Sequence, residues 1–139
     1  MGKPAIIYAT LTGHSEKIAE AMGQALGIKA KNASGRPVLK NADPLYIVGG
    51  IYGGKSLPAL LRFVKALDAK SVNSAVLVTS SARGQKQDRV RALLREKGIE
   101  VLDEFLCPGS FLFLSVGRPN KTDLQEAADF AVKVAGKDG

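Results

Sequence analysis

The sequence contains very little cysteine and no long uncharged apolar segment. Cys107 is the only cysteine among 139 residues, which excludes an internal disulfide and a thiol-rich metal site. A lone thiol fits a reducing compartment. Every hydrophobic stretch is shorter than the roughly 20 residues that a membrane-spanning helix needs. The amino terminus shows neither a signal-peptide pattern nor a myristoylation signal after Gly2. We therefore expect a cytoplasmic protein that does not insert into a membrane.

The composition is ordinary for a globular domain, apart from an excess of positive charge. Hydrophobic residues make up 45% and charged residues 24% of the chain. A chain of this length is typical of one domain, so we expect residues 1–139 to form a single domain. The net charge of +7 indicates either a solvated Lys/Arg surface or attraction to an anionic cofactor or acidic partner. No nucleic-acid-binding motif is present, so we expect no nucleic-acid partner.

Short apolar runs alternate with segments of helical periodicity along the whole chain. The expected strands are residues 4–9, 28–30, 45–48, 75–79, 99–106 and 111–114. The expected helices are residues 15–26, 57–67, 85–97 and a last one that begins with the capping-box pair Thr122 and Gln125. The polar segment 31–43 is expected to be an irregular connection. Nearly continuous apolar strands are typical of a parallel sheet with helices on both faces, so the pattern predicts a doubly wound α/β fold.

Small and polar residues join the first expected strand to the first expected helix. They are Thr10, Leu11, Thr12, Gly13, His14 and Ser15. In a doubly wound sheet, ligands bind beyond the carboxyl ends of the strands. A helix amino terminus with neighbouring hydroxyl groups suits a phosphate, so we predict a phosphate site here. The alternative is a turn in which Ser15 only caps the helix. His14, the only histidine, either contacts the phosphate weakly or is exposed.

Residues 7–19, IYATLTGHSEKIA, resemble the FMN-phosphate signature of the flavodoxin family. In that family an aromatic residue ends the strand, Ser/Thr residues and a glycine fill the loop, and an alanine lies on the helix. Two positions differ: Ser15 replaces the usual Thr, and His14 replaces a common Asn. The resemblance implies a flavodoxin-like five-stranded parallel sheet of order 2-1-3-4-5, with FMN bound where strands 1 and 3 meet.

A second glycine-rich segment, residues 49–56 (GGIYGGKS), satisfies the Walker A pattern of P-loop proteins. Two features oppose that interpretation: no aspartate ends the next apolar strand, and a P-loop usually follows the first strand. The flavodoxin resemblance explains the same residues as a loop that covers one face of the flavin ring. The residues concerned are Ile51, Tyr52, Gly53 and Gly54. The alternative for Tyr52 is packing on the helix below. The run GIYGGK also resembles the flavodoxin domain of menaquinone-dependent protoporphyrinogen oxidases.

The segment after the fourth expected strand corresponds, by the same resemblance, to the second loop that flanks the flavin. It contains Ser80, Ser81, Ala82, Arg83 and Gly84. The segment lacks the aromatic residue of the family, which leaves one ring face open or covered by Arg83 or by residues near Phe111. The alternative is a polar loop that caps the next helix. Residues 107–110 and 117–120 extend the resemblance over nearly the whole chain, and Cys107 is expected to be a buried small residue.

The resemblance implies flavin redox chemistry, in one of two classes. The first is an electron carrier, a monomer or weak dimer, that docks redox partner proteins; the second is an FMN-dependent oxidoreductase acting on a quinone, a porphyrinogen or NAD(P)H. The short chain favours the carrier, because the full-size oxidases carry additional sequence. Typical flavodoxins are acidic, so the net charge of +7 predicts acidic partners and a less strongly reducing flavin. A P-loop protein and a flavodoxin fold without FMN are further alternatives. No catalytic residue and no metal site are assigned.

Overall fold

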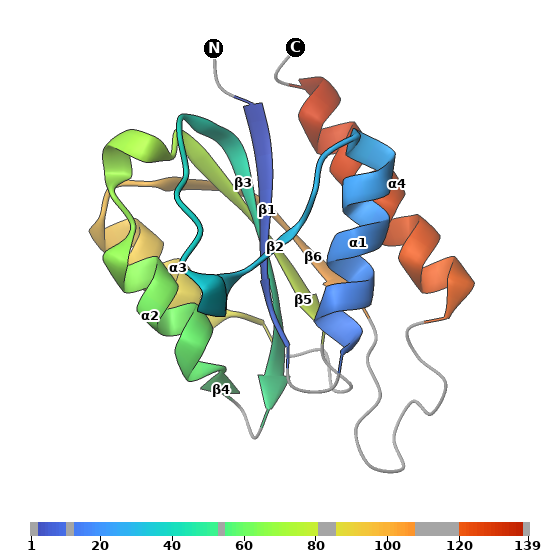
Figure 1. The fold of residues 1–139 in the computed structure, drawn as a ribbon, viewed down its shortest axis with the longest axis horizontal. Helices are drawn as coiled ribbons and strands as arrows, with labels where there is room; N and C mark the ends of the chain where they lie inside the picture. Colours follow the sequence, from blue (N-terminus) through green and yellow to red (C-terminus); the bar gives the residue numbers. More distant parts are fainter. Residues whose placement is uncertain (1–2, 11–12, 53–54, 81–85, 108–119, 138–139) are drawn as a thin grey trace.

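The computed structural model describes residues 3–10, 13–52, 55–80, 86–107 and 120–137 (Figure 1). Its strands are β1 (Lys3–Ala9), β2 (Lys31–Asn32), β3 (Ala42–Tyr52), β4 (Lys55–Ser56), β5 (Ser74–Ser80) and β6 (Glu100–Cys107). Its helices are α1 (His14–Leu26), α2 (Pro58–Ala66), α3 (Asp88–Glu96) and α4 (Lys121–Lys137). Two short 3-10 turns, η1 (Ala33–Gly35) and η2 (Ala69–Ser71), complete the described elements.

The strands form one sheet in the order β2-β1-β3-β5-β6, and all neighbours along this path are parallel. β4 adds a short antiparallel pairing at the end of β3. Since β5 and β6 are the fourth and fifth strands of the parallel path, the predicted order 2-1-3-4-5 is confirmed. The α/β class is confirmed as well.

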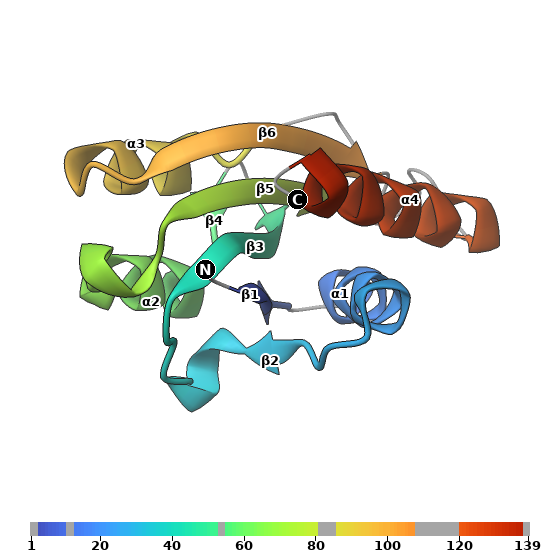
Figure 2. The same cartoon turned by 90° about the horizontal axis from the view of Figure 1, so that it is seen from above.

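Helices cover both faces of the sheet, with α1 and α4 on one face and α2 and α3 on the other (Figure 2). Successive strand residues point to opposite faces, and this alternation builds two cores. Ile7 belongs to the core under α2 and α3, whereas Ile6 packs with Ile18 and Met22 of α1. Each of these side chains is at most 1% exposed, and burial of one large apolar side chain contributes roughly 1.5–3 kcal/mol.

One polar contact fixes a helix against the sheet on the α1–α4 face. The hydroxyl of Tyr46, in β3, donates a hydrogen bond of 2.6 Å to the main-chain oxygen of Ala131, in α4. The Tyr46 side chain is completely buried, and a buried hydroxyl needs such a partner to offset its lost hydration. The bond therefore ties α4 to β3.

Several expected boundaries were wrong. The second strand is residues 31–32 rather than 28–30, and the expected irregular segment 31–43 contains β2 and η1. Both β2 residues are exposed, because β2 is an edge strand that buries no side chain. The third helix starts at Asp88 rather than at position 85, with Gln87 as its N-cap. The expected strand 111–114 lies outside the described residues.

The capping box of the last helix was assigned to the wrong pair. The main-chain nitrogen of Asn120 donates to Asp123 Oδ2 at 2.8 Å, and the nitrogen of Asp123 donates to Asn120 Oδ1 at 2.9 Å. These reciprocal bonds make Asn120 and Asp123 the capping box, in place of Thr122 and Gln125. The Gln125 side chain instead bonds Asp129 one turn further along α4.

Candidate functional site

The three loops predicted to bind the cofactor all start from the same edge of the sheet. Ala9 pairs with Gly49, Gly49 with Thr79, and Thr79 with Leu106. These four residues form one row close to the carboxyl ends of β1, β3, β5 and β6, which Figure 1 shows at the lower edge of the sheet. The parallel register therefore brings together segments that are far apart in the sequence, at the edge where doubly wound sheets bind ligands.

The first loop turns from β1 into α1 through a glycine in the left-handed region. Gly13 has φ +89° and is the N-cap of α1, without a side-chain cap. Its main-chain nitrogen donates to Thr10 Oγ1 at 2.7 Å. A hydroxyl that accepts one hydrogen bond can still donate its own proton, so Thr10 remains available as a donor. The positive φ explains the requirement for glycine here.

Ser15 lies in the first turn of α1 and has a buried hydroxyl in need of a partner. The residue is 0% exposed, and its Oγ has no hydrogen-bond partner among the described residues. The interpretation of Ser15 as the helix cap is wrong, because Gly13 occupies that position. A buried hydroxyl without a partner costs about 1–3 kcal/mol, which a ligand oxygen would offset. The hydroxyl and the first-turn N–H groups of α1 therefore fit a phosphate.

The ionisable residues around this turn leave it without excess positive charge. Burial, and secondly the charge of Lys17, lower the pKa of His14 below the ordinary histidine value. His14 is half-buried as the first residue of α1, and it is mainly neutral at neutral pH. Burial and the nearby carboxylates of Glu16 and Glu20 raise the pKa of Tyr8, so its phenol stays protonated. This turn therefore offers an anion neutral hydrogen-bond donors rather than cationic side chains.

The second loop begins as a β-hairpin rather than as a P-loop. β3 continues through Tyr52, and its end pairs antiparallel with β4, with Ile51 opposite Ser56 and Tyr52 opposite Lys55. A P-loop needs its glycines in a loop that wraps a phosphate and its Lys-Ser/Thr at the helix start. Here Gly49 and Gly50 are paired strand residues, and α2 begins only at Pro58. The backbone of the described part of this segment therefore does not support the Walker A interpretation.

The structure describes the predicted site residues only in part. Thr10, Gly13, His14 and Ser15 lie together at the β1–α1 turn, and Ser80 is the buried last residue of β5. The half-buried side chain of Ile51 lines a cavity between α2 and α3. The backbone of Tyr52 is described as part of β3. The remaining predicted residues lie outside the described residues: Leu11, Thr12, Gly53, Gly54, Ser81, Ala82, Arg83 and Gly84.

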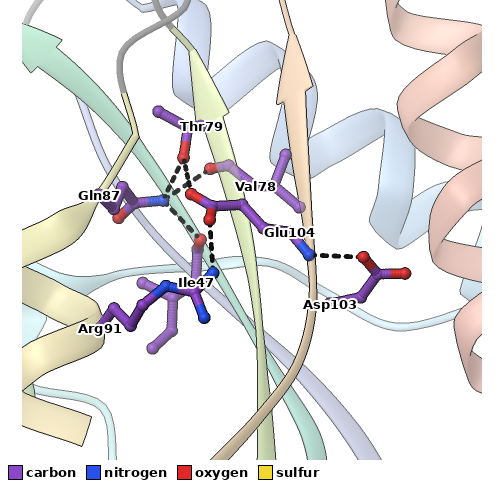
Figure 3. Close-up of polar contacts among 7 residues, drawn as sticks. All are labelled: Ile47, Val78, Thr79, Gln87, Arg91, Asp103 and Glu104. Carbon is purple, nitrogen blue, oxygen red and sulfur yellow. Dashed lines mark hydrogen bonds and ion pairs between the residues drawn. The ribbon is translucent and has the colours of Figure 1, made fainter. Parts of the chain in front are cut away.

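One polar residue beside this edge, Gln87, belongs to no motif recognised in the sequence (Figure 3). Its side chain is fully buried, and its Nε2 donates to the main-chain oxygens of Ile47 and Val78 at 3.2 and 3.0 Å. A third contact, of 3.1 Å, reaches Thr79 Oγ1. Gln87 lies three and seven positions before Val90 and Leu94, which are buried. That helical spacing was the available signal that Gln87 faces the sheet.

The Gln87 contacts continue into a charged pair on the same face of the sheet. Thr79 Oγ1 donates to Glu104 Oε2 at 3.4 Å, and Glu104 Oε1 pairs with the Arg91 guanidinium at 2.5 Å. The Glu104 side chain is 8% exposed and that of Arg91 34% exposed. Arg91 therefore compensates a nearly buried carboxylate and holds the α3 helix to β6.

The described residues form neither a metal centre nor a membrane-spanning helix. No cluster of histidine, cysteine and acidic residues in the described ranges has the arrangement of a metal centre. No described helix is long and apolar enough to cross a membrane.

Comparison with protein families gives a match over most of the chain. The profile of the flavodoxin domain family matches residues 5–111. The chain therefore belongs to the flavodoxin domain family, as the residues of the first loop predicted. An uncharacterised protein of Methanocaldococcus jannaschii is 24% identical over 146 residues, which cover 95% of this chain and 97% of the relative.

Solved structures show the same fold at low sequence identity. Oxidised flavodoxin 1 of Bacillus cereus superimposes with a TM-score of 0.75 at 18% identity, over 97% of this chain and 98% of that protein. A short-chain flavodoxin associated with a non-canonical PDU bacterial microcompartment also gives a TM-score of 0.75, at 17% identity, over 100% of both chains. These likenesses confirm the flavodoxin-like architecture, and the family implies a flavin cofactor.

Proposed function

We propose that this flavodoxin-family protein binds FMN at the carboxyl edge of its sheet and carries electrons between protein partners in the cytoplasm. The observation that carries the proposal is the buried Ser15 hydroxyl, which has no partner among the described residues and lies in the first turn of α1. A hydroxyl in this state, beside a helix amino terminus, supports a phosphate site. Family membership independently supports a flavin.

The phosphate would be held by hydroxyl and main-chain donors. Thr10, Gly13, His14 and Ser15 are the described residues of the proposed loop, and Leu11 and Thr12 complete it. Because Gly13 leaves the helix start without a side-chain cap, the first N–H groups of α1 are available to a ligand. The dipole of the 13-residue helix adds a partial positive charge at the same point.

The ring would lie between the loops that follow β3 and β5. We assign it to residues 51–54 and 80–84, which include Tyr52 as the stacking aromatic and Arg83 as a cation near the ring. When bound, FMN supplies reversible electron uptake, and the protein tunes its potential through charge, hydrogen bonds and burial. The excess of cations on this chain would favour the reduced, anionic form and acidic partner surfaces.

Two measurements test this function. First, titration of the purified protein with FMN should give one bound flavin per chain, with quenched fluorescence and a perturbed visible spectrum. A protein that leaves the FMN spectrum and fluorescence unchanged would contradict flavin binding.

The second measurement separates a carrier from an enzyme. In stopped-flow mixing, NAD(P)H alone should reduce the bound flavin slowly, whereas a flavodoxin reductase supplied with NADPH should reduce it rapidly. Rapid reduction by NAD(P)H alone would instead favour the FMN-dependent oxidoreductase, the alternative within the same family.

A further inference from the structure

A strongly basic groove lies between α2 and α3, on the face of the sheet opposite α1. The cavity has a volume of about 490 Å³. Its lining contains five cationic side chains and a single acidic one: Lys55, Arg62, Lys65, Lys86 and Arg89, with Asp88. The one ion pair within the described ranges joins Arg91 to Glu104, so none of the five cations is paired with a described carboxylate. Like charges gathered in a hollow repel one another unless an anion lies between them.

A buried hydroxyl at the groove provides an independent sign of a missing partner. Ser56 lines the cavity and is only 7% exposed, and its Oγ has no hydrogen-bond partner among the described residues. A solvated basic surface would explain exposed lysines, but it would not explain a buried hydroxyl without a partner. An anion oxygen in the groove would accept a hydrogen bond from Ser56 and face the surrounding cations.

The other residues that line the groove favour a small molecule with an apolar part as well as an anionic group. Ile51, Pro58 and Leu61 contribute apolar surface to the cavity, and its volume falls in the range of small-ligand sites. Cations with a few apolar side chains are suited to a compact organic phosphate. An extended polyanion such as nucleic acid would contact a flat or linear basic surface instead of a hollow of this volume.

The groove is separate from the proposed FMN-phosphate site. That site is at the start of α1, which covers the opposite face of the sheet (Figure 2). The groove adjoins the proposed ring loops through three residues. Ile51 belongs to the first loop, Lys55 follows that loop directly, and Lys86 lies two positions after the second loop. Lys55 and Ser56 belong to β4, Arg62 and Lys65 to α2 and Arg89 to α3, and Lys86 lies two positions before α3. None of them belongs to the proposed FMN-phosphate loop, so binding in the groove does not require bound FMN.

We propose that this groove is a second ligand site, which binds a phosphate-bearing small molecule. Arg62 and Lys65 come from α2, Arg89 comes from the first turn of α3, and Lys86 lies just before that helix. Lys55 and Ser56 close the groove from β4. The phosphate would take the hydrogen bond of Ser56, and the rest of the molecule would lie along Ile51, Pro58 and Leu61.

Calorimetric titration of the protein saturated with FMN tests the proposal, with pyrophosphate and AMP as probes and adenosine as the uncharged control. Pyrophosphate and AMP should each bind with one-to-one stoichiometry and compete with each other, whereas adenosine should not bind. The double variant Lys86→Glu/Arg89→Glu should weaken binding roughly tenfold or more, because charge-assisted hydrogen bonds are lost. The matched control Lys29→Glu/Lys133→Glu changes the same charge at exposed positions outside the groove lining and should bind as the wild type does.

The hydroxyl is tested separately by Ser56→Ala. This variant should weaken AMP binding severalfold while leaving the thermal unfolding midpoint unchanged or higher, since it removes a buried hydroxyl that lacks a protein partner. Absence of binding by both phosphates, or equal weakening by the groove and control charge variants, would overturn the proposal. Saturation with FMN keeps the two sites distinct, because FMN then occupies the proposed phosphate site at α1. If the protein fails to bind FMN, loss of AMP binding in Lys86→Glu/Arg89→Glu but not in the control variant still places AMP in the groove.

Discussion

The side-chain nitrogen of Gln87 lies 3.2 Å from the main-chain oxygen of Ile47, 40 positions earlier in the chain. The same nitrogen also reaches the oxygen of Val78 and the hydroxyl of Thr79. One amide at the N-cap of α3 therefore connects this helix to β3 and β5 near their carboxyl ends. These are the strands that lead into the two proposed ring-flanking loops, so Gln87 supports the base of the proposed cofactor site.

Gln87→Leu is expected to destabilise the fold. The substitution places a side chain of similar size at a buried position but removes the donor from three oxygen acceptors. Loss of the unpartnered Gln87 Oε1 offsets only part of this, so the free energy of unfolding should fall by about 1–3 kcal/mol. Urea denaturation measures this change. Gln24→Leu, at an exposed position of α1, is the matched control and should stay within about 0.5 kcal/mol of the wild type. Equal stability of Gln87→Leu and the control would show that the amide contacts contribute nothing.

Gly49→Ala should introduce a steric conflict in the centre of the sheet. A Cβ at this position would lie 2.6 Å from Leu60 Cδ2 and 2.9 Å from Gln87 Oε1. Leu60 and Gln87 are fully buried, so the overpacking should cost about 1–3 kcal/mol of unfolding free energy. Gly136→Ala in α4 has open space for its Cβ and should be neutral or slightly stabilising. A Gly49→Ala variant as stable as Gly136→Ala would contradict the close packing of β3 against α2 and α3.

The only histidine gives a direct pH-dependent signal. The pKa of His14 is lowered in the folded chain, so the unfolded chain binds the proton more readily, and His14 should reduce stability as the pH falls through the ordinary histidine range. Proton NMR titration should therefore find the imidazole pKa below 6.5 without ligand. A phosphate dianion nearby favours the imidazolium, so FMN should raise this pKa, whereas riboflavin, which lacks the phosphate, should raise it less. An identical shift with both flavins would argue against phosphate binding near His14.

The reduction potential of bound FMN should depend on the cations around the proposed ring site. Lys55 is exposed in β4, immediately after the proposed loop residues, and Lys55→Glu should lower the more negative midpoint potential by roughly tens of millivolts at low salt. Lys133→Glu makes the same charge change in α4 and should have a smaller effect. Spectroelectrochemical titration measures both. A wild-type potential as low as that of acidic flavodoxins would contradict the predicted effect of the net charge.

Much of the fold could be predicted because the buried strands are recognisable in the sequence. All seven residues of β5 are buried, and its apolar run predicts a central parallel strand. β2 gave no such signal, since Lys31 and Asn32 are exposed at the sheet edge, where they pair with β1. The second strand was instead predicted at residues 28–30, because apolar residues lie there, just before β2.

The capping error has a different physical cause. Asn120–Asp123 and Thr122–Gln125 both have the three-residue spacing of a capping box, and either start leaves Ala127 and Ala131 on the buried face. Hydrophobic periodicity therefore could not distinguish the two. The reciprocal hydrogen bonds of Asn120 and Asp123 decide the helix start.

At the candidate site, the sequence predicted the turn between β1 and α1 but not the residue beneath the other loops. The hydroxyls and glycine at positions 10–15 matched a family signature, and the parallel register brings their strand beside β3. Gln87 matched no motif, because its role depends on main-chain oxygens from two strands that meet only in the folded sheet. Contacts of this kind cannot be inferred from spacing along one helix.

Titration of wild type and Ser15→Ala with FMN, followed by flavin fluorescence, tests the central claim most directly. Removal of the buried hydroxyl should weaken FMN binding by about tenfold while leaving the ligand-free protein equally or more stable, because the hydroxyl has no partner among the described residues. Ser71→Ala, in η2 before β5, should bind FMN as the wild type does. Unchanged FMN affinity in Ser15→Ala, or failure of the wild type to bind FMN, would contradict a phosphate site at the start of α1.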